Sequence, residues 1–123
     1  MSGVQIPAEF DLPQTLDCGQ AFRWRPTPED SETWCGAAYG RYLTLRRVGN
    51  QLELDCSQGD MDGVWRAYFD LSEDYARIRG ELSGLSPVLK EAAEFAPGIR
   101  ILRQEPWEAL CSFIMSQNNN ISR

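Results

Sequence analysis

The 123-residue sequence has no histidine and only one lysine, against eleven arginines. Without histidine the chain cannot form an HExxH zinc site, a Ser-His-Asp triad or a Cys-His dyad. It also has no Walker phosphate-binding loop and no dinucleotide-binding glycine pattern. The single lysine, Lys90, lies near Glu91 and Glu94 on the polar side of a predicted helix. We expect a solvated charge there, because a nucleophilic lysine needs burial or cationic neighbours.

Long apolar segments are missing as well. No stretch approaches the roughly 18 apolar residues of a membrane span, and the N-terminal segment lacks the basic and apolar parts of a signal peptide. The four cysteines are irregularly spaced and form no CxxC pair. This spacing, without histidine, favours reduced cytosolic thiols and no metal site.

The negative charge of the chain is concentrated in one region. The whole sequence carries 12 basic and 18 acidic side chains, a net charge of −6. That balance argues against nonspecific binding to a polyanion. Residues 53–94, however, hold ten of the acids and only four of the bases, which accounts for the entire net charge. We expect these acids on solvated helix faces, and both ends of the chain remain free to meet a polyanion.

The first half of the chain, residues 1–56, has the pattern of an antiparallel sheet. Apolar and polar residues alternate as in half-buried strands. Gly49-Asn50 suits the two-residue turn of a hairpin, because both residue types tolerate positive φ. We expect a meander of about four or five strands. The predicted strands are residues 21–25, 33–39, 42–45 and 51–56.

The second half has the pattern of helices. Apolar residues recur at helical spacing, which gives each predicted helix one apolar face. Ser72 is the predicted N-cap of one helix, with Glu73 and Asp74 in its first turn. Proline is predicted at the first position of two later helices. The predicted helices cover residues 60–70, the segment after Ser72, residues 87–95 and the segment from Pro106 to about Met115.

Two segments contain residues that a role in the hydrophobic core does not explain. In DCGQAFRW, at residues 17–24, Gly19 would let the backbone approach a flat ligand closely, although a turn glycine is the simpler explanation of this segment alone. In SQNNNISR, at residues 116–123, the asparagines are poor helix formers and end the last helix. Their amides and Arg123 could pair with base edges, and a polar loop between helices is again the simpler explanation.

Taken together, these segments resemble the 8-oxoguanine DNA glycosylase family from about Phe10 to Arg123. The long C-terminal motif is specific, because chance similarity of that length is improbable. The motifs that carry the resemblance are CGQAFRW at Cys18–Trp24, the strand with Trp34, the YFDL step at Tyr68–Leu71, and GIRILRQEPWEALCSFIMSQNNNISR at Gly98–Arg123.

The resemblance implies an α+β fold, a twisted antiparallel sheet with packed helices that is similar in shape to the TATA-binding protein. Residues 1–97 would form this N-terminal domain, and residues 98–123 would begin the helical glycosylase domain. The chain departs from the family at Glu105, where we expect aspartate in relatives. Either acid can cap the helix that follows.

The resemblance also implies roles for particular residues. A family member flips an oxidised guanine out of duplex DNA and cleaves its glycosidic bond. The carbonyl of Gly19 would accept a hydrogen bond from the N7–H of that base, whereas N7 of normal guanine is an acceptor. Asn118 and Arg123 would contact the cytosine left unpaired, and Asn119 and Asn120 would support their loop.

The family's helix-hairpin-helix motif, nucleophilic lysine and catalytic aspartate would lie beyond Arg123. We therefore expect a piece of a longer glycosylase/AP lyase, with no catalytic residue, metal or other cofactor in this chain, and no activity alone. The expected partner is double-stranded DNA that contains oxidised guanine, and no membrane is expected. The expected state is a monomer, located in the cytoplasm at the bacterial nucleoid.

Two other functions stay open at this point. One is a binding module for damaged DNA that has the same sheet fold and no catalytic role. The other is a glycosylase for alkylated purines, which shares the architecture. For the chain alone we expect weak, salt-sensitive DNA binding, because only Arg100, Arg103 and Arg123 are predicted near the contact loop.

Overall fold

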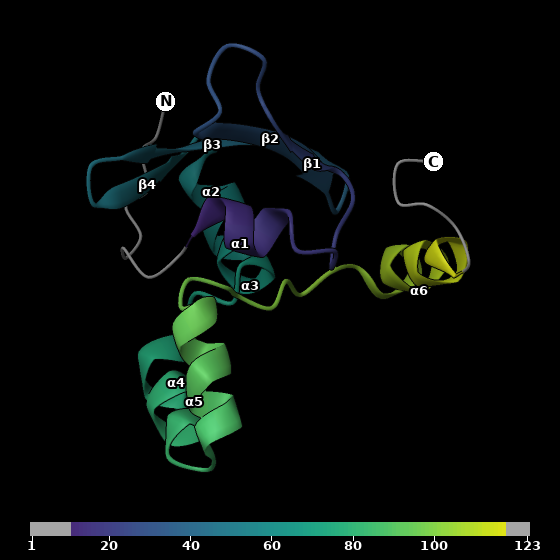
Figure 1. Ribbon diagram of the computed structural model, residues 1–123. Coiled ribbons are helices and arrows are strands. Elements are labelled where there is room, and N and C mark those ends of the chain that lie inside the picture. The colour runs from purple at the N-terminus through teal and green to yellow at the C-terminus, as the bar shows by residue number, and fades with distance from the viewer. Residues whose placement is uncertain (1–10, 118–123) are drawn as a thin grey trace.

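The computed structural model describes residues 11–117, and residues 1–10 and 118–123 lie outside the described part. It confirms an α+β fold, with an antiparallel sheet above a set of helices (Figure 1). In chain order the elements are α1 (Leu12–Leu16), β1 (Trp24–Pro26), β2 (Thr33–Ala38), β3 (Arg41–Val48), β4 (Gln51–Leu54), α2 (Gln58–Asp60), the π-helical turn η1 (Met61–Trp65), α3 (Arg66–Tyr68), α4 (Tyr75–Ser83), α5 (Pro87–Phe95) and α6 (Pro106–Ser116).

The sheet is the predicted meander, with its strands in the order β1-β2-β3-β4 and each pair antiparallel. The hairpin turn at Gly49-Asn50 is confirmed, since Val48 pairs with Gln51 across it. The first strand is shorter and later than predicted, because it starts at Trp24 and includes Pro26. β1 is an edge strand, where proline is tolerated, and the residues before Trp24 form a loop.

The core lies between one face of the sheet and the helices α1 to α3 (Figure 1). Residues of β2 alternate between buried and partly exposed, as a sheet with one covered face requires. Leu52 and Leu54 share the buried face of β4, which matches their alternate positions in the sequence. An aromatic cluster fills one end of this core. Its members are Trp24, Trp65, Tyr68 and Phe69, whose ring centroids lie 5.0–6.1 Å apart.

Tyr68 joins the aromatic cluster to the first strand by a buried hydrogen bond. Trp24 Nε1 donates to the Tyr68 hydroxyl at 2.9 Å, so neither polar atom is left without a partner in the core. Burial raises the pKa of Tyr68 to about 12. The phenol is therefore neutral in the folded chain at ordinary pH.

The helix α1 is absent from the sequence prediction, which treated residues 1–56 as sheet only. It is a helix of five residues, too short to show helical periodicity. Its N-cap is Asp11, whose Oδ1 accepts a hydrogen bond from the Gln14 amide at 2.8 Å, and Pro13 lies in the first turn. The Asp-x-Pro pattern of a helix start was the available signal.

The helix predicted at residues 60–70 lies two residues nearer the N-terminus. It runs from Gln58 to Tyr68 and includes the π-helical turn. Ser57 caps it, because the Asp60 amide donates to Ser57 Oγ at 3.0 Å. The sequence prediction of the next helix start was wrong as well. Asp74, not Ser72, is the N-cap of α4, and its Oδ1 accepts from the Arg77 amide at 3.1 Å.

The reason for this shift is the turn that follows α3. Asp70 has a left-handed φ of 56°, and the Glu73 amide donates to the Asp70 carbonyl at 3.3 Å. Ser72 is thus used within the turn and cannot cap the helix. Glu73 and Asp74 precede α4 instead of lying in its first turn.

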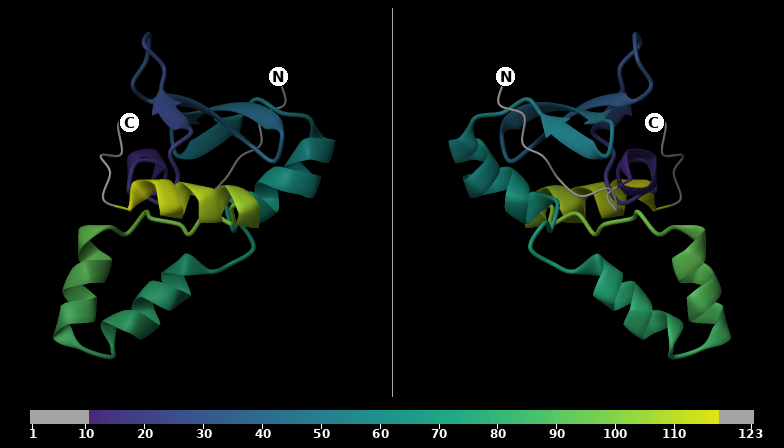
Figure 2. Two further views of the ribbon diagram at one scale, coloured as in Figure 1. Left: turned by 90° about the vertical axis from the view of Figure 1, so that its right-hand side faces the viewer. Right: turned by 90° about the vertical axis from the view of Figure 1, so that its left-hand side faces the viewer.

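The last two predicted helices are confirmed with their caps. Ser86 Oγ accepts from the Leu89 amide at 3.1 Å, and Glu105 Oε2 accepts from the Glu108 amide at 2.7 Å, so glutamate does cap α6. The helices α4 and α5 form a hairpin that projects away from the sheet (Figures 1 and 2). No helix within residues 11–117 has the length and apolar character needed to cross a membrane.

Candidate nucleic-acid interface

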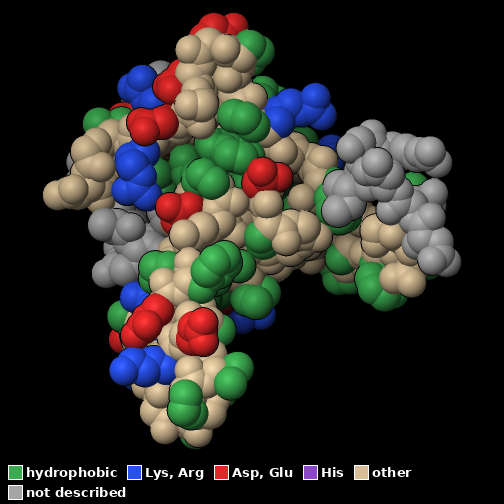
Figure 3. Space-filling view, viewed as in Figure 1, with side chains coloured by type: hydrophobic (Ala, Val, Ile, Leu, Met, Phe, Trp, Pro, Cys, Tyr) green, Lys and Arg blue, Asp and Glu red, His purple; other side chains and the backbone are tan. Residues whose placement is uncertain are grey.

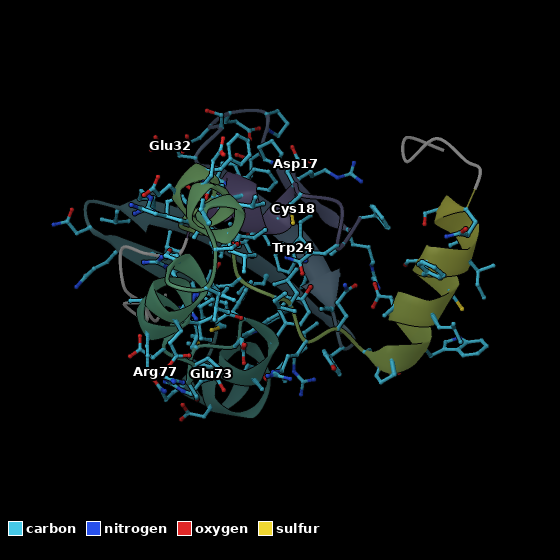
Figure 4. All side chains as sticks on the ribbon, turned by 60° about the horizontal axis from the view of Figure 1, so that its bottom comes forward. Asp17, Cys18, Trp24, Glu32, Glu73 and Arg77 are labelled. Atoms are coloured by element: carbon cyan, nitrogen blue, oxygen red, sulfur yellow. The ribbon has the colours of Figure 1, made fainter. Side chains whose placement is uncertain are left out.

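The loop between α1 and β1 presents Gly19 to solvent. Gly19 is exposed and has a φ of +95°, a conformation that glycine adopts without a Cβ penalty. A Cβ built at this position would meet no atom within 4 Å, so the space beside the backbone is open. Figure 4 shows the neighbouring Cys18 beside α1, on the same side of the molecule as Trp24. The backbone at Gly19 is therefore accessible to a ligand.

The residue after Gly19 is held by its own side chain. Gln20 Nε2 donates to the carbonyls of Thr15 at 3.0 Å and Arg100 at 2.7 Å, and Gln20 Oε1 accepts from the Leu102 amide at 3.0 Å. Both amide hydrogens and the amide oxygen are thus used. The side chain bridges the end of α1 and an extended segment more than 80 positions later in the chain.

That extended segment, residues 98–105, runs from the α4–α5 hairpin to α6, and we call it the linker. It is fixed to α1 at Gly98, whose amide donates to Gln14 Oε1 at 2.8 Å and whose carbonyl accepts from the Asp11 amide at 2.9 Å. Thr15 Oγ1 donates to the Gly98 carbonyl and accepts from the Arg100 amide, each at 3.1 Å. These hydrogen bonds hold the linker against α1, so it is not a loose connection.

The linker also contacts the Gly19 loop from the other side. Gln104 Nε2 donates to the carbonyl of Gln20 in a short hydrogen bond. Next to it, Arg23 Nη1 forms an ion pair with Glu108 Oε1 in α6 at 3.0 Å. The Gly19 loop is thus joined to the linker and to the helix that leads toward the C-terminal segment.

A polar network around Asp70 holds the opposite side of the linker. Asp70 Oδ2 accepts from the Tyr75 hydroxyl at 2.7 Å, and Asp70 Oδ1 accepts from Arg103 Nε at 2.9 Å. The Tyr75 hydroxyl also accepts from the Ile101 amide at 3.1 Å. Burial alone would raise the pKa of Asp70, but the hydrogen bonds and the charges of Arg103 and Arg100 outweigh it and lower that pKa.

The sequence placed Arg100 and Arg103 near the DNA-contact loop, and in the structure both also bond to Asp70. Arg100 is only 5% exposed, its Nη1 donates to the Asp70 carbonyl at 2.9 Å, and its guanidinium lies 4.5 Å from the centre of the Tyr75 ring. Arg103 is paired with Asp70. Both arginines fix the linker to the turn after α3, which the sequence pattern did not reveal.

The second segment singled out from the sequence follows α6 directly. Asn118, Asn119, Asn120 and Arg123 lie outside the described residues, so their predicted roles stay predictions. The helix α6 that precedes them has a large apolar surface (Figure 3). The predicted apolar face is present but uncovered, with Trp107 70%, Ile114 60% and Met115 66% exposed.

Other side chains that could react or bind a metal lie apart from this loop. Lys90 is exposed on α5, as expected for a solvated charge. All four cysteines are free thiols, and burial, then the charges of Asp60 and Asp55, raise the pKa of Cys56. Within residues 11–117 no group of three or more His, Cys, Asp and Glu side chains could hold a metal ion. In Figure 4, Glu73 lies at the far end from Cys18.

The sequence pattern predicted Gly19 but missed Gln20 and Gln104, which determine how the loop is held. Side chains that bond to distant backbone have no periodicity, and the bonds between these two segments join residues 80 to 84 positions apart. The available signal was the position of two glutamines inside the motifs of segments 18–24 and 98–123.

Three comparisons identify known proteins to which this chain is similar. A family model described as "8-oxoguanine DNA glycosylase, N-terminal domain" matches residues 4–110. The N-glycosylase/DNA lyase of Saccharomyces cerevisiae is 33% identical over 138 residues, which cover 94% of this chain and 34% of that protein. The chain spans about a third of the length of the curated relatives it matches, the N-glycosylase/DNA lyase OGG1 of Arabidopsis thaliana among them.

Solved structures agree in fold and in sequence. MBOgg1 in complex with a low affinity DNA ligand has a TM-score of 0.88 and 44% identity, covering 97% of this chain and 40% of that one. The 8-oxoguanine glycosylase/lyase of Clostridium acetobutylicum, in complex with double-stranded DNA containing cytosine opposite 8-oxoguanine, has a TM-score of 0.85 and 39% identity. That match covers 93% of this chain and 39% of the other.

Proposed function

Because the chain belongs to the 8-oxoguanine DNA glycosylase family, we propose that it is the N-terminal part of a base-excision-repair N-glycosylase and AP lyase. The whole enzyme removes 8-oxoguanine from opposite cytosine in double-stranded DNA. The observation that carries this proposal is the Gly19 loop, where exposed backbone with open space beside it is held in place by hydrogen bonds between Gln20 and the linker.

The chemistry of recognition follows from the two forms of the base. Oxidised guanine has a hydrogen on N7, and normal guanine has a lone pair there. The carbonyl of Gly19 would accept a hydrogen bond from N7–H of oxidised guanine. With normal guanine it would face the lone pair on N7. A polar group left without a partner in a closed site is costly, so this contact rejects the wrong base more than it attracts the right one.

The C-terminal segment supplies the other half of this proposal. Flipping a base out of the helix costs a few kcal/mol of lost stacking and pairing and leaves a cytosine without its partner. Asn118 and Arg123 contact that cytosine, with Asn119 and Asn120 supporting the loop. These contacts give the preference for cytosine opposite the lesion. Their position directly after α6, which Arg23 and Glu108 connect to the Gly19 loop, supports the assignment.

The chain alone is proposed to be inactive. Its relatives are about three times as long, and the nucleophilic lysine and catalytic aspartate belong to the remaining part. Residues 1–97 are the sheet-and-helix domain, and residues 98–123 begin the helical domain. The whole enzyme acts as a monomer in the cytoplasm, at the bacterial nucleoid, and uses no cofactor.

A panel of duplexes tests the function. The gene product that contains this chain is incubated with duplexes carrying 8-oxoguanine opposite cytosine, an alkylated purine, or no lesion. We expect base release and strand cleavage on the first duplex only, and none by the 123-residue chain alone. Release of the alkylated purine would favour the alkyl-purine glycosylase. Tight binding without release would favour a noncatalytic module, and cleavage by the short chain would contradict the assignment.

Variants at Gly19 test the residue that carries the proposal. Gly19→Val and Gly19→Pro in the active gene product should reduce excision of 8-oxoguanine far more than cleavage at an abasic site, because an abasic site has no base to recognise. Equal loss on both substrates would indicate misfolding instead of lost recognition.

A further inference from the structure

We propose that Gln20 and Gln104 are positioning residues that fix the direction of the Gly19 carbonyl, and through it the discrimination between oxidised and normal guanine. This inference rests on the proposed recognition role of Gly19. It adds two residues that do not touch the base themselves.

The backbone at Gly19 is conformationally free. Gly19 is exposed, has a φ of +95°, and has no atom within 4 Å of the place a Cβ would take. Gly19 therefore has no side chain whose packing could fix the direction of its carbonyl. A glycine backbone is also the most permissive of all, so that direction must be imposed from neighbouring residues.

Gln20 imposes it from one side. Its side-chain amide lies between the Arg100 carbonyl, 2.7 Å from Nε2, and the Leu102 amide, 3.0 Å from Oε1. These are the two bonds that a neighbouring strand would make to an extended segment, here made by one side chain. A third bond, from Nε2 to the Thr15 carbonyl at 3.0 Å, ties the same group to α1. The Cα of Gln20 is thus anchored to two segments of the folded domain.

Gln104 imposes it from the other side. Its Nε2 donates to the main-chain carbonyl of Gln20, which fixes the peptide plane between Gln20 and Ala21. With the Cα and the following peptide both held, the peptide unit that carries the Gly19 carbonyl has little freedom left. Pre-organised groups of this kind contribute to specificity because no energy is spent on orienting them when the ligand binds.

The chain offers a matched control in Gln14. Gln14 is half-buried like Gln104, and its side chain also makes a hydrogen bond to backbone, from the Gly98 amide to Oε1 at 2.8 Å. That bond joins the linker to α1 and does not involve the Gly19 loop. Removal of either glutamine side chain should therefore destabilise the domain similarly, while only Gln104 should affect recognition.

The test uses Gln104→Ala, Gln104→Glu and Gln14→Ala in the gene product that contains the chain. Gln104→Glu keeps the shape but replaces the donor with an acceptor facing the Gln20 carbonyl. The readout is the ratio of kcat/KM for 8-oxoguanine excision to kcat/KM for abasic-site cleavage. We expect this ratio to fall up to about tenfold in both Gln104 variants, the equivalent of one hydrogen bond, and to stay unchanged in Gln14→Ala.

An unchanged ratio in the Gln104 variants, or an equal fall in Gln14→Ala, would overturn the inference. If the unmodified gene product excises no 8-oxoguanine, the proposed function fails, and NMR of the 123-residue chain decides the positioning role separately. Shifts of the Gly19 and Gln20 amides in Gln104→Ala but not in Gln14→Ala would support that role, and identical spectra in this loop would overturn it.

Discussion

Gly98 illustrates how a single residue fixes the linker to the domain. A Cβ at this position would lie 2.3 Å from the Cβ of Asp11 and 3.0 Å from its amide nitrogen. The hydrogen bonds of Gly98 with Asp11 and Gln14 require this close approach. Glycine is therefore needed at position 98 because a side chain would collide with Asp11, and not because the backbone has an unusual φ.

Gly98→Ala should lower the free energy of unfolding by about 1–3 kcal/mol, because the linker must move away from α1. Gly80→Ala supplies the control, since Gly80 lies within α4 and a Cβ there would meet nothing within 4 Å. That change should be neutral or stabilise by up to about 1 kcal/mol through helix propensity. Urea denaturation measures both, and equal stability of the two variants would contradict the account of the linker.

The lowered pKa of Asp70 predicts that the free energy of unfolding depends on pH. Its pKa is lowered in the folded chain from an ordinary value of 3.8. A carboxylate with a lowered pKa stabilises the folded state above the unfolded value, and this contribution disappears as pH falls through the folded value. The Asp70 contribution should therefore be complete above about pH 5 and decline below about pH 4.

Asp70→Asn tests this prediction and keeps a side chain that tolerates the left-handed φ. At pH 7 it should destabilise by about 1–3 kcal/mol through the lost charged hydrogen bonds, and the difference should shrink toward pH 3. Asp62→Asn is the control, because the ion pair of Asp62 with Arg66 is exposed and worth less than about 1 kcal/mol. A difference for Asp70→Asn that is constant from pH 7 to 3 would refute the assignment.

Among the elements, α6 differs from the rest of the domain. It has no buried residue, although its sequence is mostly apolar, and it lies away from the sheet (Figures 1 and 2). In β3, by contrast, Leu43 and Leu45 are fully buried. Leucines in the two elements thus have opposite environments, buried in β3 and half-exposed at Leu110 in α6.

Substitutions in these two elements should have different costs. Leu45→Ala should destabilise the chain by about 2–5 kcal/mol through the cavity it leaves. Leu110→Ala in α6, where the side chain is 50% exposed, should cost less than about 1 kcal/mol. Thermal denaturation of the 123-residue chain compares them, and a Leu110→Ala cost as large as that of Leu45→Ala would show that α6 is covered in solution.

The elements also show what the sequence could and could not predict. Periodicity predicted the antiparallel meander and the shared face of Leu52 and Leu54 in β4, because these follow from alternation along each strand. It missed α1, which is too short for any period, and it placed the cap of α4 at Ser72, because Ser and Asp are equally good caps and only the turn at Asp70 decides between them. The site follows the same division, since Gly19 has a local signal, whereas the only signal for Gln104 is its position inside the C-terminal motif.

At the scale of the whole molecule, the charge distribution predicts the strength of the proposed DNA binding. Residues 53–94 carry the net negative charge and lie mainly in α2 to α5. Arg100 is buried and Arg103 is paired with Asp70 while its side chain stays 64% exposed, so of these two only Arg103 can reach a phosphate. The chain alone should therefore make few phosphate contacts.

Fluorescence anisotropy with a short duplex measures this directly. Binding by the 123-residue chain should be weak, and the slope of log K against log salt should be no steeper than about −3, which corresponds to about three phosphate contacts. Arg123→Ala should make the slope shallower by about 1, whereas Arg103→Ala should change stability more than the slope. Tight binding at physiological salt would contradict this view of the charge distribution.

The central claim, that the Gly19 carbonyl reads the N7–H of oxidised guanine, has a direct test in the substrate. 7-Deaza-8-oxoguanine keeps the 8-oxo group but has C–H in place of N7–H, so it cannot donate to a carbonyl. The affinity of the gene product that contains this chain is measured for two duplexes, each with one of these bases opposite cytosine. We predict that the deaza duplex binds about tenfold or more weakly, the equivalent of one lost hydrogen bond with an unpaired carbonyl. Equal affinity for the two duplexes would contradict the account.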